Sequence, residues 1–461
     1  MSILALVYVA FACVVSLFAP WLGVLFYYLF SVGQMQSMWP HHFGLESRVA
    51  LMMTAATFIG LCGATAIKAV NYRTLILPHT LAIVALTAWV NLSIPYSSYL
   101  LYHNALPGEL TQAEIISIFN KIIVFYFFAV LLINTRKKLV MLIYAFAAIL
   151  VYYAWWANMM YFTGQFWLFG INGRLGGMPR SVYFDENYLA MLFVFATPVL
   201  YYIGISYKNF YIRYGIWSLI PMTWHALFLT GSRGGLLSLA VVIIYLFFRS
   251  FHRLASIGII AGLVVAVIFQ SGVLLNRVDN TIDAAQTDEE IVSEEAALDP
   301  RLVSWKVGSQ MVADYPVFGV GVGNFTIAFP DYSNTKRHVA HNTFLQFSAE
   351  CGLLAGLLYL WWFWMRLKNV FKKPAPGTVF EGGLHRDYLE DLLNSLFIGL
   401  FMVGVFLDLM IFEIVYMIFM LSAAKYAIEH KVPTAARAPK KTIYRVGQNE
   451  EDKQDLEPGT T

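Results

Sequence analysis

The residues of this sequence that could carry chemistry are arginines and histidines in polar stretches between apolar runs. Arg233 lies in the turn Thr230-Gly231-Ser232-Arg233-Gly234-Gly235, which separates two apolar segments. Glycines let a ligand approach the backbone closely, and the free N–H groups at the start of a helix attract an anion. We therefore expect Arg233 to bind a phosphate group. The alternative is an arginine that only reaches toward lipid headgroups.

Two more arginines have a similar setting. Arg180 follows Gly176-Gly177-Met178-Pro179, and Arg301 comes directly after Asp299-Pro300, where a helix is predicted to begin. An arginine in the first turn opposes the helix dipole, so Arg301 is expected to serve a ligand. The alternative is a surface arginine that pairs with the preceding acidic residues. Arg180, Arg233 and Arg301 are together candidates to bind a diphosphate, because guanidinium groups match phosphate oxygens well.

Polar and glycine residues near these arginines are candidates for supporting roles. Asp185 and Asn187 begin an apolar run and could support the site, although Asp185 could simply cap a helix. Gly319 and Gly321, in Phe318-Gly319-Val320-Gly321-Val322-Gly323-Asn324, could form a backbone nest for an anion. Three glycines would serve any sharp bend equally well. The turn is not a dinucleotide-binding fingerprint, because no βαβ pattern surrounds it.

His338 and His341 are the candidates for proton transfer. An unperturbed histidine titrates near pH 6.5 and can accept a proton at neutral pH. The neighbouring Lys336 and Arg337 favour the neutral form of these rings and are candidates for supporting roles. The alternative is an interfacial histidine without a catalytic role, and the sequence leaves open which of the two would be the base.

Composition identifies the class of protein that must position these residues. The 461-residue chain is 59% hydrophobic and only 13% charged, and its mean hydropathy is +0.62. Soluble proteins carry about 25% charged residues, and apolar runs of about 20 residues suffice to cross a bilayer. A membrane barrel would instead show alternating strands of about ten residues. We predict an all-α polytopic membrane protein of about 12 transmembrane helices with a large helical loop on the outer side of the membrane.

Apolar runs give the expected spans. Residues 2–33, with Pro20 in the middle, make either one span plus a half-helix or two short spans. The further runs are 48–69, 75–92, 114–134, 139–162, 188–206, 214–230, 235–249, 254–273, 342–366, 389–407 and 410–427. Cys13, Cys62 and Cys351 all fall in apolar runs, so no disulfide framework is expected. The start of the chain lacks the basic region and cleavage site of a removable signal peptide.

Basic residues alternate between successive connections, which predicts the orientation. The clusters near residues 68–73, 136–138, 208–213, 249–253 and 366–373, and the C-terminal tail, are expected in the cytoplasm. The predicted division is 1–273 for the N-terminal helices, 274–341 for the large outer loop (periplasmic if the family resemblance described below holds), 342–428 for the C-terminal helices and 429–461 for a disordered cytoplasmic tail.

The outer segment itself has two parts. Residues 276–300 are acidic and lack aromatic residues, as in a solvated strap. In the second part, Val303, Val307 and Met311 recur every four residues, which predicts an amphipathic helix that ends before Pro316. The arginine and histidine candidates then fall mostly on the outer side, and Arg233 breaks the pattern of cytoplasmic cations. We expect this segment to lie over a lipid-buried groove.

Four short motifs in this region resemble the O-antigen ligase and polymerase family. They are Thr230-Gly231-Ser232-Arg233-Gly234, Arg301 with Trp305, Tyr315-Pro316-Val317-Phe318-Gly319-Val320-Gly321, and His341-Asn342-Thr343-Phe344-Leu345-Gln346 with Glu350-Cys351-Gly352-Leu353. Asp185-Glu186-Asn187-Tyr188-Leu189-Ala190 is similar to the family's Asn-x-x-Ala helix start.

The resemblance implies a GT-C-type glycosyltransferase of the bacterial inner membrane, with its active site facing the periplasm. The implied donor is a glycan on undecaprenyl diphosphate, and the implied acceptor is a sugar hydroxyl of lipid A–core. The family's arginines map to Arg233 and Arg301, and its histidine maps to His341 or to His338. The family works without metal or nucleotide, and in this sequence the outer loops contain no Asp-x-Asp pair to hold a metal. The expected partners are therefore these two lipids and the membrane, with no cofactor and no nucleic acid.

Other functions remain open from the sequence. An enzyme of the same family could polymerise the glycan on its lipid carrier or transfer it to protein. A lipid-linked glycan transporter would bury charges in mid-membrane, whereas the charges here gather at one face. A membrane scaffold without catalysis is the last alternative.

Overall fold

The computed structural model describes residues 2–43, 48–67, 70, 72–99, 110–170, 173–249, 300–371 and 386–430. These residues form helices and their connections, and the isolated bridge between Phe169 and Leu175 is the β-pairing found among them. The expected span 254–273, the acidic strap 276–300 except for its last residue, and the tail after residue 430 lie outside the described residues.

Within the described ranges, five helices are long and apolar enough to cross a membrane. They are α5 (Val49–Ala66), α7 (Gln112–Leu132), α8 (Arg136–Phe162), α9 (Glu186–Ile205) and the part Tyr388–Phe406 of α18 (Arg386–Phe406). The shorter apolar helices α1 (Ile3–Phe18) and α2 (Pro20–Ser31) meet at Ala19, directly before Pro20. The chain is thus a helical protein of multi-pass membrane character, whereas the expected total of 12 spans stays a prediction.

The remaining helices are shorter or more polar. They are α3 (Met35–Met38), α4 (Pro40–Phe43), α6 (Pro78–Ser93), α10 (Phe210–Trp217), α11 (Leu219–Thr230), α12 (Arg233–Arg249), α14 (Pro300–Asp314), α15 (Phe325–Ala328), α16 (Thr343–Cys351), α17 (Leu353–Val370) and α19 (Glu413–Glu429). Short 3-10 turns lie at Tyr72–Ile76, Ile94–Tyr96, Phe166–Leu168 and Phe329–Asp331.

One expected span is interrupted, which corrects the prediction of a continuous helix over 342–366. Gly352 separates α16 from α17 and has a φ of 88°, in the left-handed region. The backbone N–H of Leu353 donates to the carbonyl of Pro316 at 2.9 Å. The loop after α14 thus inserts its own backbone where the helix would have continued. The expected run 214–230 is likewise divided, between α10 and α11.

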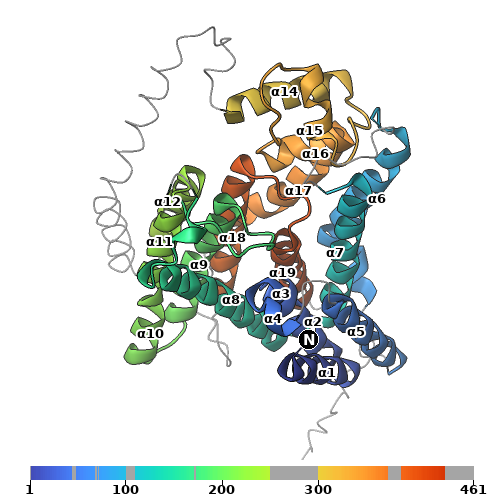
Figure 1. The fold of residues 1–461 in the computed structure, drawn as a ribbon. Coiled ribbons are helices and arrows are strands. Elements are labelled where there is room, and N and C mark those ends of the chain that lie inside the picture. Colours follow the sequence, from blue (N-terminus) through green and yellow to red (C-terminus); the bar gives the residue numbers. More distant parts are fainter. Residues whose placement is uncertain are drawn as a thin grey trace, which may run out of the picture.

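Helix α9 lies in the interior of the bundle. Of its most apolar 18-residue window, 94% is buried inside the protein. It packs against α8, α10, α11, α12 and α18, and Figure 1 shows it among these helices. Because α9 is fixed on all sides, its first turn, which follows Asp185, is a rigid platform for the groups placed there.

The polar segment after residue 300 forms a cap, made of α14, α15 and α16, at one end of the bundle (Figure 1). Val303, Val307 and Met311 of α14 are buried, which confirms the predicted apolar face. An added Cβ at Gly308 would lie 2.7 Å from the side chain of Leu345, so the missing side chain lets α14 rest closely on α16. The cap therefore holds Arg301, in the first turn of α14, at a fixed height above the bundle.

Ion pairs join the helices at the opposite end. Arg249 of α12 pairs with Asp391 of α18 at 2.7 Å, and Arg366 of α17 pairs with Glu390 at 3.0 Å. Lys425 of α19 pairs with Glu390 as well. Removing one partner of such a buried pair leaves an uncompensated charge. These basic residues, expected from the sequence as cytoplasmic charges, therefore also tie α12, α17, α18 and α19 together.

Candidate functional site

The turn that carries Arg233 is shaped by close helix packing. Gly231 ends α11 with a φ of 58°, and Arg233 is the exposed first residue of α12. A Cβ on Gly234 would lie 3.1 Å from Phe406 of α18, and a Cβ on Gly235 would lie 2.9 Å from the Cβ of Ala190 in α9. The two glycines therefore let α12 start in contact with both neighbours, which fixes the position of Arg233.

Arg301 and this turn face one crevice. The crevice is lined by Asn187, Ser232, Gly234, Gly235, Arg301, Val403, Phe406 and Leu407. The guanidinium carbon of Arg301 lies 5.6 Å from the centre of the Phe406 ring. The volume of about 10 Å³ is close to the minimum that holds one water molecule, so a larger anion would have to bind at the mouth. The structure thus brings together two segments that are 68 residues apart in the sequence.

Asp408, an acid that the sequence analysis missed, holds the backbone of His341 beside the same crevice. The backbone N–H groups of His341 and Asn342 donate to the two carboxylate oxygens of Asp408, at 3.1 and 3.2 Å. Asp408 follows Leu407, which lines the crevice. The φ of His341 is 49°, in the left-handed region. A non-glycine residue there costs roughly 1–2 kcal/mol, and such strain gathers at functional sites.

Burial raises the pKa of Asp408 from 3.8 to about 6, while the two backbone N–H donors act in the opposite direction. The residue is 8% exposed. An acid in Leu407-Asp408-Leu409, in the short connection between two predicted spans, is itself a signal, because an ionisable residue with only apolar neighbours beside a span marks a candidate functional site. That signal could have identified Asp408 from the sequence.

His338 has a different environment. Its ring lies edge-on to Phe329, with centroids 5.9 Å apart, in the small apolar cluster under the cap. Burial, and secondarily the charge of Lys336, lower the pKa of His338. The side chains of Lys336 and Arg337 are exposed. The geometry therefore connects His341, rather than His338, with the crevice.

Arg180 is not among the residues that line the crevice. Its carbonyl accepts a hydrogen bond of 3.3 Å from the hydroxyl of Ser37 in α3, and its φ is 63°. The side chain is exposed. Asp185 is the N-cap of α9, because its carboxylate accepts from the N–H of Asn187 at 2.7 Å. Asp185 therefore caps a helix, which the sequence analysis gave as the alternative to a supporting role in the site.

Arg174 is a second residue that the sequence analysis missed. Its Nε donates to the carbonyl of Thr230 at 3.0 Å, and its Nη2 donates to the Oδ1 of Asn187 at 3.0 Å. The Nη1 pairs with Glu186 at 2.5 Å. Arg174 thus fastens the loop before α9 to the turn before α12. A cation on the predicted outer side breaks the charge pattern, as Arg233 does, and could have been noticed for that reason.

The expected anion nest at Gly319 and Gly321 is already filled by the protein itself. The N–H groups of Val320 and Gly321 donate to the carbonyls of Ala349 and Glu350, at 2.8 and 2.9 Å. The N–H of Gly323 donates to the Glu350 carboxylate at 2.9 Å. Because these amides are engaged, the loop joins the cap to α16 and does not offer them to a phosphate. Its positive φ angles serve this close approach.

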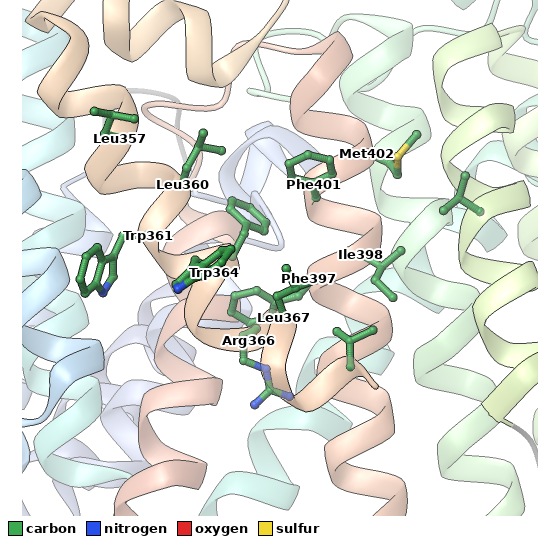
Figure 2. A pocket seen from close by; sticks show the side chains of 13 residues that line it. Leu357, Leu360, Trp361, Trp364, Arg366, Leu367, Phe397, Ile398, Phe401 and Met402 are labelled. Atoms are coloured by element: carbon green, nitrogen blue, oxygen red, sulfur yellow. The ribbon is translucent and has the colours of Figure 1, made fainter. Parts of the chain in front are cut away.

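An apolar groove shares helices α12 and α18 with the crevice. Figure 2 shows its lining, from α12, α17 and α18, and its volume is about 700 Å³. Phe397, Phe401 and Met402 of α18 line the groove, whereas Val403 and Leu407 of the same helix line the crevice. The groove volume is typical of sites for organic ligands. One helix therefore connects an apolar slot with the cationic site.

Among the described residues, no group of three histidine, cysteine, aspartate or glutamate side chains is placed to hold a metal ion. The cationic groups at the crevice, Arg301 with Arg233 beside it, are suited to an anion instead.

Comparison with known proteins identifies the central region of the chain. Residues 217–360 match the model of the O-antigen ligase family. The matched region contains Arg233, Arg301, His338 and His341, so the resemblance drawn from the short motifs is confirmed there. Asn187 and Asp408 lie outside it. A comparison with curated proteins finds no match to the chain.

Proposed function

Starting from this O-antigen ligase region, we propose that the protein is a membrane glycosyltransferase that moves a glycan from undecaprenyl diphosphate to a sugar hydroxyl of lipid A–core. The observation that carries the proposal is the convergence of three segments at the end of α18. Arg301 lines the crevice beside the turn of Arg233, and Asp408, next to that crevice, holds the backbone of His341. The site would face the periplasm of the bacterial inner membrane, as the charge pattern predicts.

The groove and the crevice suit the two parts of a polyprenyl diphosphate. The isoprenoid chain would lie in the apolar groove, and the diphosphate would bind at the mouth of the crevice between Arg233 and Arg301. Arginine pairs strongly with phosphate oxygens and stays charged at any relevant pH. This arrangement would place the first sugar of the glycan above the crevice, on the side of His341.

The proposed reaction is a direct displacement at the anomeric carbon. The acceptor oxygen forms a bond to this carbon while the bond to the diphosphate oxygen breaks, and the diphosphate leaves with the electron pair. His341 takes the proton of the acceptor hydroxyl. Arg233 and Arg301 stabilise the negative charge that grows on the leaving group, where fixed cations are most effective. This single displacement inverts the configuration at the anomeric carbon.

Purified protein tests the proposal when it is supplied in detergent with an undecaprenyl-diphosphate glycan and lipid A–core. General-base catalysis contributes about 10²–10⁴-fold, so His341→Ala should reduce kcat by about that factor. His338→Ala is the matched control, and it should stay within a few-fold of the unmodified protein. If His338→Ala lost activity while His341→Ala kept it, the assignment of the base would be reversed.

The products separate the remaining alternatives. Growth of the glycan on its own lipid carrier, without transfer to lipid A–core, would show a polymerase of the same family. Transfer to a peptide would show protein glycosylation. A new linkage with retained configuration, read by NMR, would exclude the single displacement.

A further inference from the structure

The crevice contains a neutral donor whose direction is set by Arg174. The side-chain oxygen Oδ1 of Asn187 accepts from Arg174 at 3.0 Å and from the hydroxyl of Ser232 at 2.8 Å. Asn187 itself lines the crevice together with Arg301. The question is which way the other half of the amide, its NH₂ group, must point.

The chemistry of the neighbours decides the orientation of this amide. A guanidinium group has donors and no acceptor, so the Asn187 atom that faces Arg174 must be the oxygen. Ser232 accepts the N–H of Gly235 at 3.2 Å through its hydroxyl oxygen, and its own hydrogen is therefore available to Asn187. Exchanging the amide oxygen and nitrogen would set the NH₂ of Asn187 against the donors of Arg174. The NH₂ group must point away from Arg174 and Ser232.

Arg174 is suited to this positioning role rather than to binding the substrate. Its guanidinium donates to Thr230 and Asn187 and forms an ion pair of 2.5 Å with Glu186. The guanidinium is thus held at three points between the loop before α9 and the turn before α12. An arginine with its charge already paired is a poor phosphate ligand and a good anchor.

In the described part of the chain, no hydrogen bond is recorded from the Asn187 NH₂ group, while its oxygen has two. The other side chain in the crevice lining that can hydrogen-bond strongly beyond this network is Arg301, which offers only donors. Two side chains with donor groups, from different helices, therefore border one small space, and this arrangement suits a hydrogen-bond acceptor.

We propose that the Asn187 NH₂ group donates a hydrogen bond to the diphosphate of the donor lipid, and that Arg174 and Ser232 are the residues that position it. The inference rests on the proposed function. A fixed neutral donor at the leaving group strengthens as charge develops there, and it needs no reorganisation during the reaction. The hydrogen bonds that its oxygen receives from Arg174 and Ser232 polarise the amide and make the NH₂ a better donor.

The decisive variant is Asn187→Asp. An aspartate keeps an oxygen toward Arg174 and Ser232, so the anchor network and the fold should persist. Its second oxygen would replace the NH₂ and would repel a phosphate. We expect the affinity for undecaprenyl diphosphate in detergent micelles to fall at least tenfold. The donor KM should rise, while the acceptor KM and the thermal unfolding midpoint stay unchanged.

Asn209→Asp is the matched control. Asn209 caps α10, where its side-chain oxygen accepts from the N–H groups of Tyr211 and Ile212. Aspartate caps a helix as well as asparagine does, so this variant adds the same charge and should bind undecaprenyl diphosphate normally. Arg174→Lys should raise the donor KM several-fold without changing the acceptor KM, because one ammonium group cannot hold Asn187 and Thr230 in the same geometry.

Arg301→Ala in the same binding assay separates the two proposals. If Arg301→Ala binds undecaprenyl diphosphate as tightly as the unmodified protein, the proposed function of the crevice fails. If Arg301→Ala loses binding and Asn187→Asp retains it, the proposed function stands and the role of Asn187 is overturned. An equal rise of both donor and acceptor KM in Arg174→Lys would show a merely structural role for Arg174.

Discussion

Replacing Asp408 by asparagine should reduce activity much more than stability. The carboxylate accepts the backbone N–H groups of His341 and Asn342, one on each oxygen. Asparagine has one acceptor oxygen, so one of the two N–H groups would face an NH₂ group. A buried donor left without a partner costs about 1–3 kcal/mol.

A second effect of the same substitution has the opposite sign. Burial raises the pKa of Asp408 from 3.8 to about 6. Each pKa unit corresponds to about 1.4 kcal/mol, so ionising this buried group costs about 3 kcal/mol at neutral pH. Asparagine avoids that cost. The two effects nearly cancel, and the free energy of unfolding should change by no more than about 2 kcal/mol.

Activity should respond differently because it depends on the position of His341. A displacement of about 1 Å can lower a rate about 100-fold. We expect kcat to fall by about this factor, with the donor KM unchanged. The assay is transfer of a labelled glycan from undecaprenyl diphosphate to lipid A–core, with thermal unfolding measured on the same sample. Asp331→Asn is the control, since Asp331 is an exposed acid of the cap that accepts from Tyr99 at 2.5 Å.

The pH dependence gives an independent readout of Asp408. The native carboxyl keeps its proton up to about pH 6, whereas the unfolded chain loses it near pH 4. Between these values the native state binds more protons, so the Asp408 contribution to stability falls as the pH rises and then levels off. This slope should be absent in Asp408→Asn. Full activity of the variant from about pH 5 to pH 8, or an unchanged slope of stability, would refute the reasoning.

Three further substitutions test the elements that position the site. Gly352→Ala would place a Cβ 1.8 Å from a backbone oxygen at a φ of 88°, so thermal unfolding should show a large loss of stability or a failure to fold, whereas Gly63→Ala, with open space around it, should be neutral. Gly308→Val would lift α14 from α16 and displace Arg301, so diphosphate binding should weaken at least tenfold; binding that stays normal would show that the cap does not set the site. Ile398→Trp would fill part of the groove and should raise the KM for a long-chain polyprenyl donor more than for a short one. Leu237→Trp, on the exposed face of α12, should leave both KM values unchanged.

The sequence by itself determined the class of the protein and most of its helices. Apolar runs of bilayer length mark helices because backbone groups in lipid must be satisfied within the segment, and α5, α7, α8 and α9 lie close to the runs predicted for them. The spacing of Val303, Val307 and Met311 gave the buried face of α14, because a four-residue repeat returns to the same side of a helix. Local patterns of this kind need no knowledge of distant contacts.

Local patterns also identified Arg233 and Arg301 as candidate phosphate-binding residues, because a charged group at the end of a membrane span is costly unless it has a partner. They could not decide between the two histidines. His338 and His341 are three residues apart, and only the packing shows that His338 lies on Phe329 while His341 is held by Asp408. Nor could they separate a glycine turn that binds an anion from one that wraps around Glu350.

Tertiary structure alone decided which distant residues meet. Gly352 breaks an apolar run that otherwise reads as one span, because the backbone of Pro316 takes the N–H that a continuous helix would have used. Arg174 reaches Asn187 and Thr230, and the end of α18 meets both Arg301 and the backbone of His341. Such contacts join distant parts of the chain through packing and buried hydrogen bonds. Packing and hydrogen bonds of this kind produce no periodic pattern in the sequence.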